Sequence, residues 1–250
     1  EHIILKKGEI IGYTGDTGSL SGPHIHFEIR DEFNQPINPL LKYYTIDDTL
    51  PPIANSISFI PLSSKTWING IQDYQTMEIK KINNNKYVIQ DTISIQGEFG
   101  IALETYDIIN NLDQFKFGVY NIQLLIDNIE YYSIKFDKYN FNENPLIYTE
   151  IDYMLVKNNN LSHRLFNNTD NNLSFIKTEL DGRINLDKKF HNLIINVFDA
   201  NNNQIQIQGI LTGKSSPIID AKIKDKNNIF EIMFEKNNSD RIFFKKESKL

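Results

Sequence analysis

From residue 53 onward, short apolar segments alternate with short polar turns. The apolar segments are rich in Ile, Phe and Tyr, which favour the pleated, half-buried surface of a β-sheet. The predicted strands are 56–60, 76–81, 86–90, 93–96, 100–106, 115–126, 129–136, 193–198, 205–210, 218–223 and 229–234. Polar turns such as residues 83–85 separate them, and this spacing predicts an all-β fold with antiparallel, immunoglobulin-like sandwiches.

Two further segments bear on the fold class. Residues 193–198 and 205–210 flank the Asn-rich turn 199–203 and predict a long hairpin that could close a sandwich. Residues 148–156 fit a helix and a strand equally well. Because the chain has neither a heptad pattern nor an internal repeat, we expect little helix.

The first 45 residues have a different pattern, with many glycines. Residues 3–5 and 9–13 predict two strands around a turn, residues 14–23 form a Gly-rich loop, and residues 24–30 predict a third strand. We predict that residues 1–45 are the C-terminal portion of one domain and that residues 46–51 are a linker, which ends at two consecutive prolines. Residues 52–214 are predicted to form a β-sandwich accessory region of one or two immunoglobulin-like units, and residues 215–250 a further β segment.

The composition excludes some functions. Of the 250 residues, 40% are hydrophobic and 23% are charged, which is typical of a globular chain. The formal net charge is −6 and the basic residues are scattered, so nucleic acid is not an expected partner. The chain has no cysteine, which excludes disulfides and thiolate chemistry, and no apolar run approaches the ~20 residues needed to span a bilayer.

Candidate chemistry lies in the predicted strand 24–30. Alternate residues of a strand face the same side, so His24, His26, Glu28 and Arg30 should share one face, while the apolar residues between them share the other, which can pack on a core. Two imidazoles two residues apart can converge on a metal ion or its bound water. The triplet alone is a weak indication, because a surface strand can carry it by chance.

The surrounding sequence is more specific. The segments EIIGYTGDTG (9–18), GPHIHFEIR (22–30) and INP (37–39) closely resemble, in order, the end of the catalytic domain of lysostaphin/LytM-type zinc endopeptidases. The resemblance covers about residues 3 to 40 and does not extend to residues 50–250.

The resemblance implies roles for individual residues. His26 corresponds to a zinc ligand, and His24 to a catalytic partner of the zinc-bound water or the developing oxyanion. Thr17, Ser19 and Ser21 are candidates for lining the substrate cleft, although hydrogen bonding within the loop accounts for them equally well. The family often has Ser at the position of Leu20, so a polar contact from that position is not expected here.

Other residues of this segment have structural explanations. The loop glycines are expected to meet backbone requirements. Glu28 is expected to pair with a neighbour such as Arg30, and Asn38 and Pro39 to fix the exit turn.

A catalytic zinc site needs three protein ligands, and the family supplies the other two as an upstream His followed four residues later by Asp. No His in this chain is followed by Asp at that spacing. We therefore interpret the chain as a fragment, with any signal peptide upstream, and expect it to bind Zn²⁺ weakly and to lack peptidase activity by itself.

The expected function of the intact protein is that of a zinc metalloendopeptidase that hydrolyses peptide cross-links in peptidoglycan, in the bacterial cell envelope. The alternative is a catalytically degenerate LytM-type domain that binds the cell wall or regulates other wall hydrolases. Residues 52–250 could bind the wall or act as a spacer, and the sequence makes no prediction of the oligomeric state. An aromatic group at Tyr131, Tyr132, Phe136 and Tyr139 could bind sugar, but packing in the core is the favoured explanation.

Overall fold

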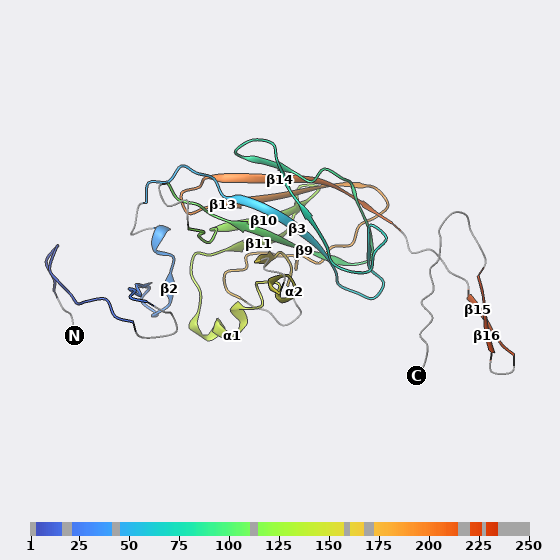
Figure 1. Cartoon of the computed structure of the whole chain (residues 1–250), viewed down its shortest axis with the longest axis horizontal. Coiled ribbons are helices and arrows are strands. Elements are labelled where there is room, and N and C mark those ends of the chain that lie inside the picture. Colours follow the sequence, from blue (N-terminus) through green and yellow to red (C-terminus); the bar gives the residue numbers. More distant parts are fainter. Residues whose placement is uncertain are drawn as a thin grey trace. The chain divides into compact units, whose positions relative to one another are not determined.

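The computed structural model describes residues 4–16, 22–41, 46–110, 115–157, 161–167 and 173–214, and the backbone of 221–226 and 229–234 (Figure 1). Strands make up 42% of the structure and helices 7%, which confirms the all-β prediction. Contacts group the chain into two units, Glu1–Lys214 and Ser215–Leu250. The finer division and the immunoglobulin-like assignment stay predictions.

The larger sheet of the first unit has eight strands, ordered β11-β10-β13-β14-β7-β6, with β8 pairing both β14 and β4. These strands are β4 (Trp67–Ile68), β6 (Lys80–Lys81), β7 (Lys86–Val88), β8 (Ile93–Gln96), β10 (Asn121–Ile126), β11 (Ile129–Lys135), β13 (Phe190–Phe198) and β14 (Gln204–Gly213). The second sheet has the order β12-β9-β3-β5. Its strands are β3 (Ile53–Pro61), β5 (Gln75–Glu78), β9 (Phe99–Tyr106) and β12 (Ser162–Arg164).

The predicted hairpin near residue 200 is confirmed. β13 and β14 pair antiparallel from Phe190↔Thr212 to Phe198↔Gln204, and Asn202 in the turn has a φ of 65°. The expectation of a purely antiparallel sheet is wrong, because β14 pairs parallel with both β7 and β8. β7 and β8 therefore run in the same direction, which is also the direction of β14.

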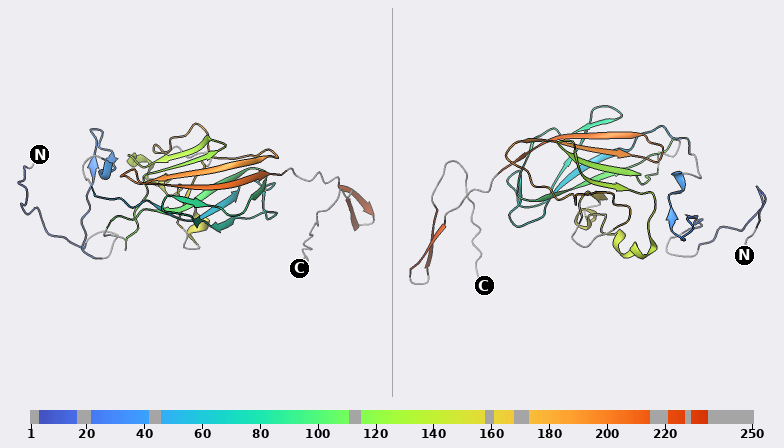
Figure 2. Two further views of the ribbon diagram at one scale, coloured as in Figure 1. Left: turned by 90° about the horizontal axis from the view of Figure 1, so that it is seen from above. Right: turned by 180° about the vertical axis from the view of Figure 1, so that it is seen from behind.

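One hydrophobic core lies between the two sheets, whose strands form two layers in Figure 2. Fully buried side chains from the second sheet, such as Phe59 and Ile101, belong to the same cluster as Ile122 and Ile195 from the first. Alternate residues along β10 and β13 are buried, as expected for strands with one face on a core. Burying these apolar surfaces stabilises the sandwich by about 25 cal/mol per Å² removed from water.

Short elements complete the first unit. They are β1 (Ile29–Arg30), β2 (Pro36–Ile37), the 3-10 helices η1 (Pro39–Leu41) and η2 (Phe141–Glu143), and the helices α1 (Asn144–Ile147) and α2 (Tyr153–Val156). The ambiguous segment 148–156 thus ends as a helix, which begins where the Asp152 side chain accepts the amides of Met154 and Leu155. In the second unit, β15 (Ala221–Lys226) and β16 (Ile229–Phe234) form an antiparallel pair.

Replacing Gly182 with Ala should destabilise the sandwich by about 1–3 kcal/mol. Gly182 has a φ of 73°, and a Cβ at this position would lie 2.2 Å from the Leu165 carbonyl oxygen. Leu165 is fully buried, and its amide donates to the Ile101 carbonyl at 2.9 Å. A movement of this backbone would therefore disturb buried packing and a hydrogen bond. Urea unfolding measures the loss. Gly118→Ala is the matched control, since nothing lies within 4 Å of its Cβ position, and an equal loss in both variants would contradict the prediction.

Candidate functional site

The segment that carries the predicted chemistry is mostly extended without being paired in a sheet. Of the predicted strand 24–30, only Ile29 and Arg30 form a strand, pairing with Pro36 and Ile37. The His24 amide donates to the Gly15 carbonyl at 3.3 Å, an isolated bridge across the glycine-rich loop. The predicted strands at 3–5 and 9–13 are also not present in the described residues 4–16, although the turn at Lys6–Glu9 forms.

His26, Glu28 and Arg30 lie on one side of the chain, as the two-residue period predicted. His26 Nε2 lies 2.6 Å from Glu28 Oε1, and Arg30 Nε donates to Glu28 Oε2 at 2.7 Å. The hydrogen bond from His26, and then that from Arg30, lowers the pKa of the Glu28 carboxyl below its usual value. Glu28 is thus a charged residue that orients two neighbours, and its expected pairing with Arg30 is confirmed.

His24 has a different environment. Its Nδ1 atom lies 3.1 Å from the Gly22 carbonyl oxygen, and the side chain is half-buried. The other candidate residues, Thr17, Ser19 and Ser21, lie outside the described residues. Of the described residues on either side of them, Asp16 accepts the Gly22 amide through Oδ1 at 2.7 Å.

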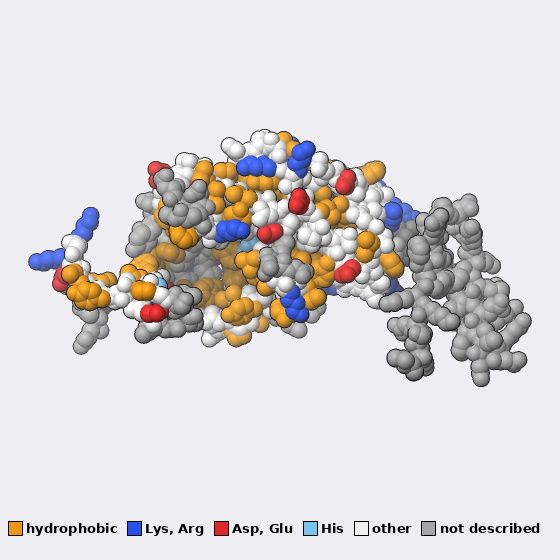
Figure 3. Space-filling view, in the orientation of Figure 1, with side chains coloured by type: hydrophobic (Ala, Val, Ile, Leu, Met, Phe, Trp, Pro, Cys, Tyr) orange, Lys and Arg blue, Asp and Glu red, His pale blue; other side chains and the backbone are white. Residues whose placement is uncertain are grey.

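The apolar side of this segment could pack on a core, but the described residues leave most of it exposed. Ile25 is 76% exposed and Phe27 is 56% exposed. Further large apolar side chains are exposed before the loop, at Ile4, Ile10, Ile11 and Tyr13, and Figure 3 shows hydrophobic side chains along this end of the chain. The described residues supply no layer that covers them, and an uncovered hairpin is at best marginally stable.

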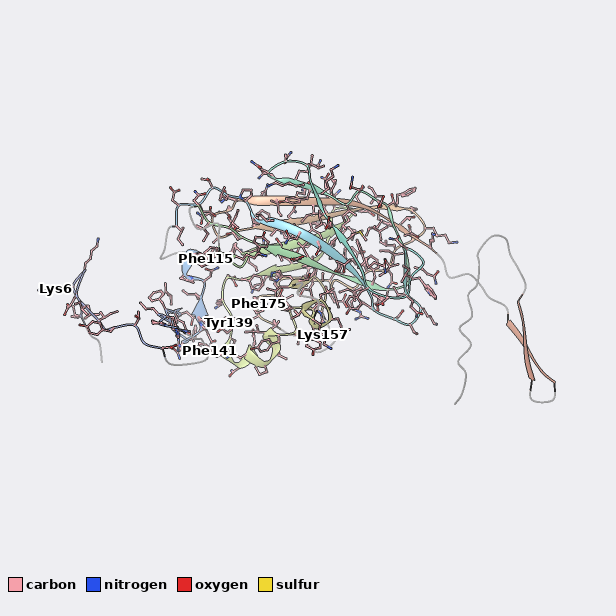
Figure 4. All side chains as sticks on the ribbon, viewed as in Figure 1. Lys6, Phe115, Tyr139, Phe141, Lys157 and Phe175 are labelled. Atoms are coloured by element: carbon pink, nitrogen blue, oxygen red, sulfur yellow. The ribbon has the colours of Figure 1, made fainter. Side chains whose placement is uncertain are left out.

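A pocket of about 480 Å³ lies beside the His26–Glu28 pair. Residues 26–29 and 36–39 line one side, and Phe136, Tyr139 and Phe175 line the other. Figure 4 shows Tyr139, Phe141 and Phe175 near this end of the sandwich. The sequence did not indicate this pocket, because its aromatic side comes from Phe136, Tyr139 and Phe175, far along the chain from His26.

The segment that follows β2 is hydrogen-bonded to the sandwich. The Asn38 amide donates to the Asp137 carbonyl at 2.8 Å, and Asn38 Nδ2 donates to the Phe136 carbonyl at 3.0 Å. Asn38 Oδ1 also accepts the Leu40 amide at 3.1 Å, which confirms its predicted role in the exit turn. Arg30 lies over the Phe141 ring, with its Cζ atom 4.8 Å from the ring centroid.

The aromatic group singled out in the sequence mainly serves packing. Tyr132 is 1% exposed, and Tyr131, Phe136 and Tyr139 pack against the core. The favoured explanation of these residues is therefore confirmed.

The described residues do not complete a catalytic zinc site, which requires three protein ligands. His26 is 75% exposed and its near carboxylate belongs to Glu28, which also pairs with Arg30. In the described ranges, the one group of three potential ligands is made of aspartates and contains no histidine.

Comparison with known proteins gives a partial match. The chain is 47% identical over 36 residues to the DD-carboxypeptidase/endopeptidase Mpg of Neisseria meningitidis serogroup B (strain MC58) and to that of Neisseria gonorrhoeae. The match covers 14% of this chain and 8% of each of these curated relatives. No family model matches the chain, and no solved structure matches it. One stretch is therefore similar to peptidases, while most of the chain is without a match.

The helices of the described ranges are all too short to cross a membrane.

Proposed function

We propose that this chain carries the His-x-His end of a zinc-dependent peptidase that cleaves peptide cross-links in peptidoglycan, in the cell envelope. The 36-residue similarity to DD-carboxypeptidase/endopeptidases carries the proposal. The geometry supports it, since His26 is exposed, oriented by Glu28 and placed at the edge of a pocket.

In this proposal His26 is a metal ligand and His24 is a catalytic partner. Glu28 holds the His26 ring through Nε2 and is itself held by Arg30, an arrangement that fixes the orientation of an imidazole. A single imidazole leaves the ligand set incomplete, so no step of the reaction follows from the described residues alone.

Replacing His26 with Ala in the complete gene product should abolish chelator-sensitive release of peptides from purified peptidoglycan, with a loss of at least about 100-fold. His191→Gln is the matched control, because His191 lies on β13 and bonds to Asp127 and Asp187. The control should retain its activity. Equal activity of the two variants would overturn the proposed role of His26.

The catalytically degenerate alternative makes a different prediction in the same assay. A protein that binds the wall or regulates other hydrolases would show no chelator-sensitive cleavage before any substitution is made. It would still sediment with purified peptidoglycan.

A further inference from the structure

Three aspartates from distant parts of the sequence meet at one end of the sandwich. Asp48 precedes β3, Asp107 follows β9, and Asp199 follows β13. Their side chains are 8%, 6% and 1% exposed, respectively. One carboxylate oxygen from each lies within 4.8 Å of the others. The fold therefore buries three acidic groups at a single point.

The cluster contains an oxygen with no partner. Asp107 Oδ1 is buried and makes no hydrogen bond. Asp107 is more than nine-tenths buried, and its carboxylate faces the other two. Among the ion pairs of the described residues, none joins a Lys, Arg or His to any of these three aspartates. A buried carboxylate oxygen without a hydrogen-bond donor, in a carboxylate without a counter-charge, is costly, so this arrangement points to a missing cation.

The other two carboxylates are held in place by backbone amides. Asp48 Oδ1 accepts the amides of Leu50 at 3.1 Å and Asn110 at 3.3 Å. Asp199 Oδ1 accepts the amides of Asn201 and Asn203, both at 2.8 Å. These bonds orient the carboxylates without neutralising them.

Electrostatics indicates the same shortage of positive charge. Burial, and then the charges of Asp199 and Asp48, raise the pKa of Asp107 to about 7. Burial likewise raises the pKa of Asp199. Burial and the neighbouring carboxylates thus disfavour the charged form of Asp107.

We propose that Asp48, Asp107 and Asp199 form a calcium-binding site. Carboxylate oxygens are the ligands that hard cations prefer, and the cluster offers neither the nitrogen nor the sulfur ligands favoured by zinc. The three oxygens lie within 4.8 Å of one another, close enough for one ion to contact all of them. Magnesium usually takes only one or two protein carboxylates and keeps several waters, whereas calcium takes more oxygen ligands, so three carboxylates favour calcium.

The ion would tie the segment that enters the sandwich to the turn between β13 and β14. The side-chain amides of Asn201 and Asn203 already donate to the Asp48 carbonyl, at 3.3 and 3.2 Å. Asn201 also donates to the Ile46 carbonyl at 2.7 Å. Calcium would thus hold residues 46–50 against the sandwich, and this role does not depend on peptidase activity.

Thermal unfolding of the 250-residue chain tests the site, in 10 mM CaCl₂ and in EGTA at pH 7.5. Calcium should raise Tm by roughly 3–10 °C, if Kd lies in the range of about 10⁻⁴–10⁻³ M that is typical of extracellular sites. Isothermal titration should show one calcium per chain. An unchanged Tm together with no binding heat would overturn the proposal, and an equal Tm rise with MgCl₂ would overturn the assignment to calcium.

The Asp107→Asn variant distinguishes a role of Asp107 as a metal ligand from a purely structural role. This variant should lose the calcium-dependent rise, yet have a higher Tm than the wild type in EGTA because one repelling charge is gone. The exposed Asp91→Asn is the matched control and should keep the full rise. A lower Tm for Asp107→Asn in EGTA, with the calcium response intact, would assign Asp107 a purely structural role. Should that variant not fold, Asp48→Asn serves in the same comparison.

Discussion

Replacing Asp152 with Ala should lower the free energy of unfolding by about 3–5 kcal/mol, the range expected when one partner of a buried ion pair is removed. Asp152 is fully buried. Its Oδ2 atom accepts Arg164 Nε at 3.0 Å, and its Oδ1 atom accepts the amides of Met154 at 3.0 Å and Leu155 at 3.1 Å. One substitution therefore leaves a guanidinium unpaired and removes the N-cap of α2.

Urea unfolding at pH 7 measures this loss. Asp152→Asn keeps an acceptor for the helix amides but not the charge, and should lose less than the Ala variant. Asp91→Ala changes an exposed aspartate and should stay within about 0.5 kcal/mol of the wild type. A loss below about 1 kcal/mol for Asp152→Ala would show that burial of the pair cancels its attraction.

Sequence patterns predicted most of the longer strands, because these strands are defined by their own residues, but the predicted strand 115–126 begins only at Asn121 and the predicted strand 76–81 is divided between β5 and β6. The strand 93–96 was predicted with its observed bounds, and β9 and β11 each begin or end within one residue of the prediction. The two-residue β4 and three-residue β12 were not predicted. Such short segments become strands through the partners that the fold gives them, and the local sequence does not specify these partners.

The same distinction explains the outcome at the candidate site. The side-by-side arrangement of His26, Glu28 and Arg30 follows from a local period of two and was predicted. The strand itself was overpredicted, because the exposed Ile25 and Phe27 have no covering layer in the described residues.

Side-chain clusters assembled from distant segments were not predicted from the sequence. The aspartate cluster joins residues 48, 107 and 199, and only the folded chain brings them together. A weak signal existed, since Asp199 opens the Asn-rich turn of the predicted hairpin and Asp48 lies in the predicted linker before β3. Neither signal identifies the third residue.

The chain should become less stable as the pH rises from 6 to 9, and Glu150→Gln should remove the part of this dependence that arises at His163, while Asp107, with its pKa raised to about 7, adds a separate part of the same sign. His163 Nδ1 lies 2.5 Å from Glu150 Oε1, and Glu150 is only 6% exposed. Burial by itself would lower the pKa of His163, but the charge and hydrogen bond of Glu150 outweigh it and raise the pKa above 6.5. A raised folded-state pKa gives stability that is complete below the unfolded-state value and is lost as the pH rises through the folded-state value.

Other charged groups near His163 have partners of their own. Arg164 and Asp152 form their own ion pair beside it. The Phe136 ring packs against the imidazole, with 5.9 Å between the two ring centroids. The pKa of the buried Tyr132 is raised further by the Glu150 charge, so this phenol does not titrate below pH 9. His191 also has a raised pKa through Asp127 and adds a smaller dependence of the same sign, because Asp127 is partly exposed and screened by solvent.

Urea unfolding at pH 6, 7.5 and 9 separates these contributions. Glu150→Gln should lower stability most at pH 6, where the wild-type His163 carries more charge than at pH 7.5 or 9, and should reduce the slope toward pH 9. His191→Gln should keep the main slope of the wild type. If the slope instead disappears with His191→Gln and persists in Glu150→Gln, the pH dependence arises at the exposed pair, and the buried histidine is neutral throughout.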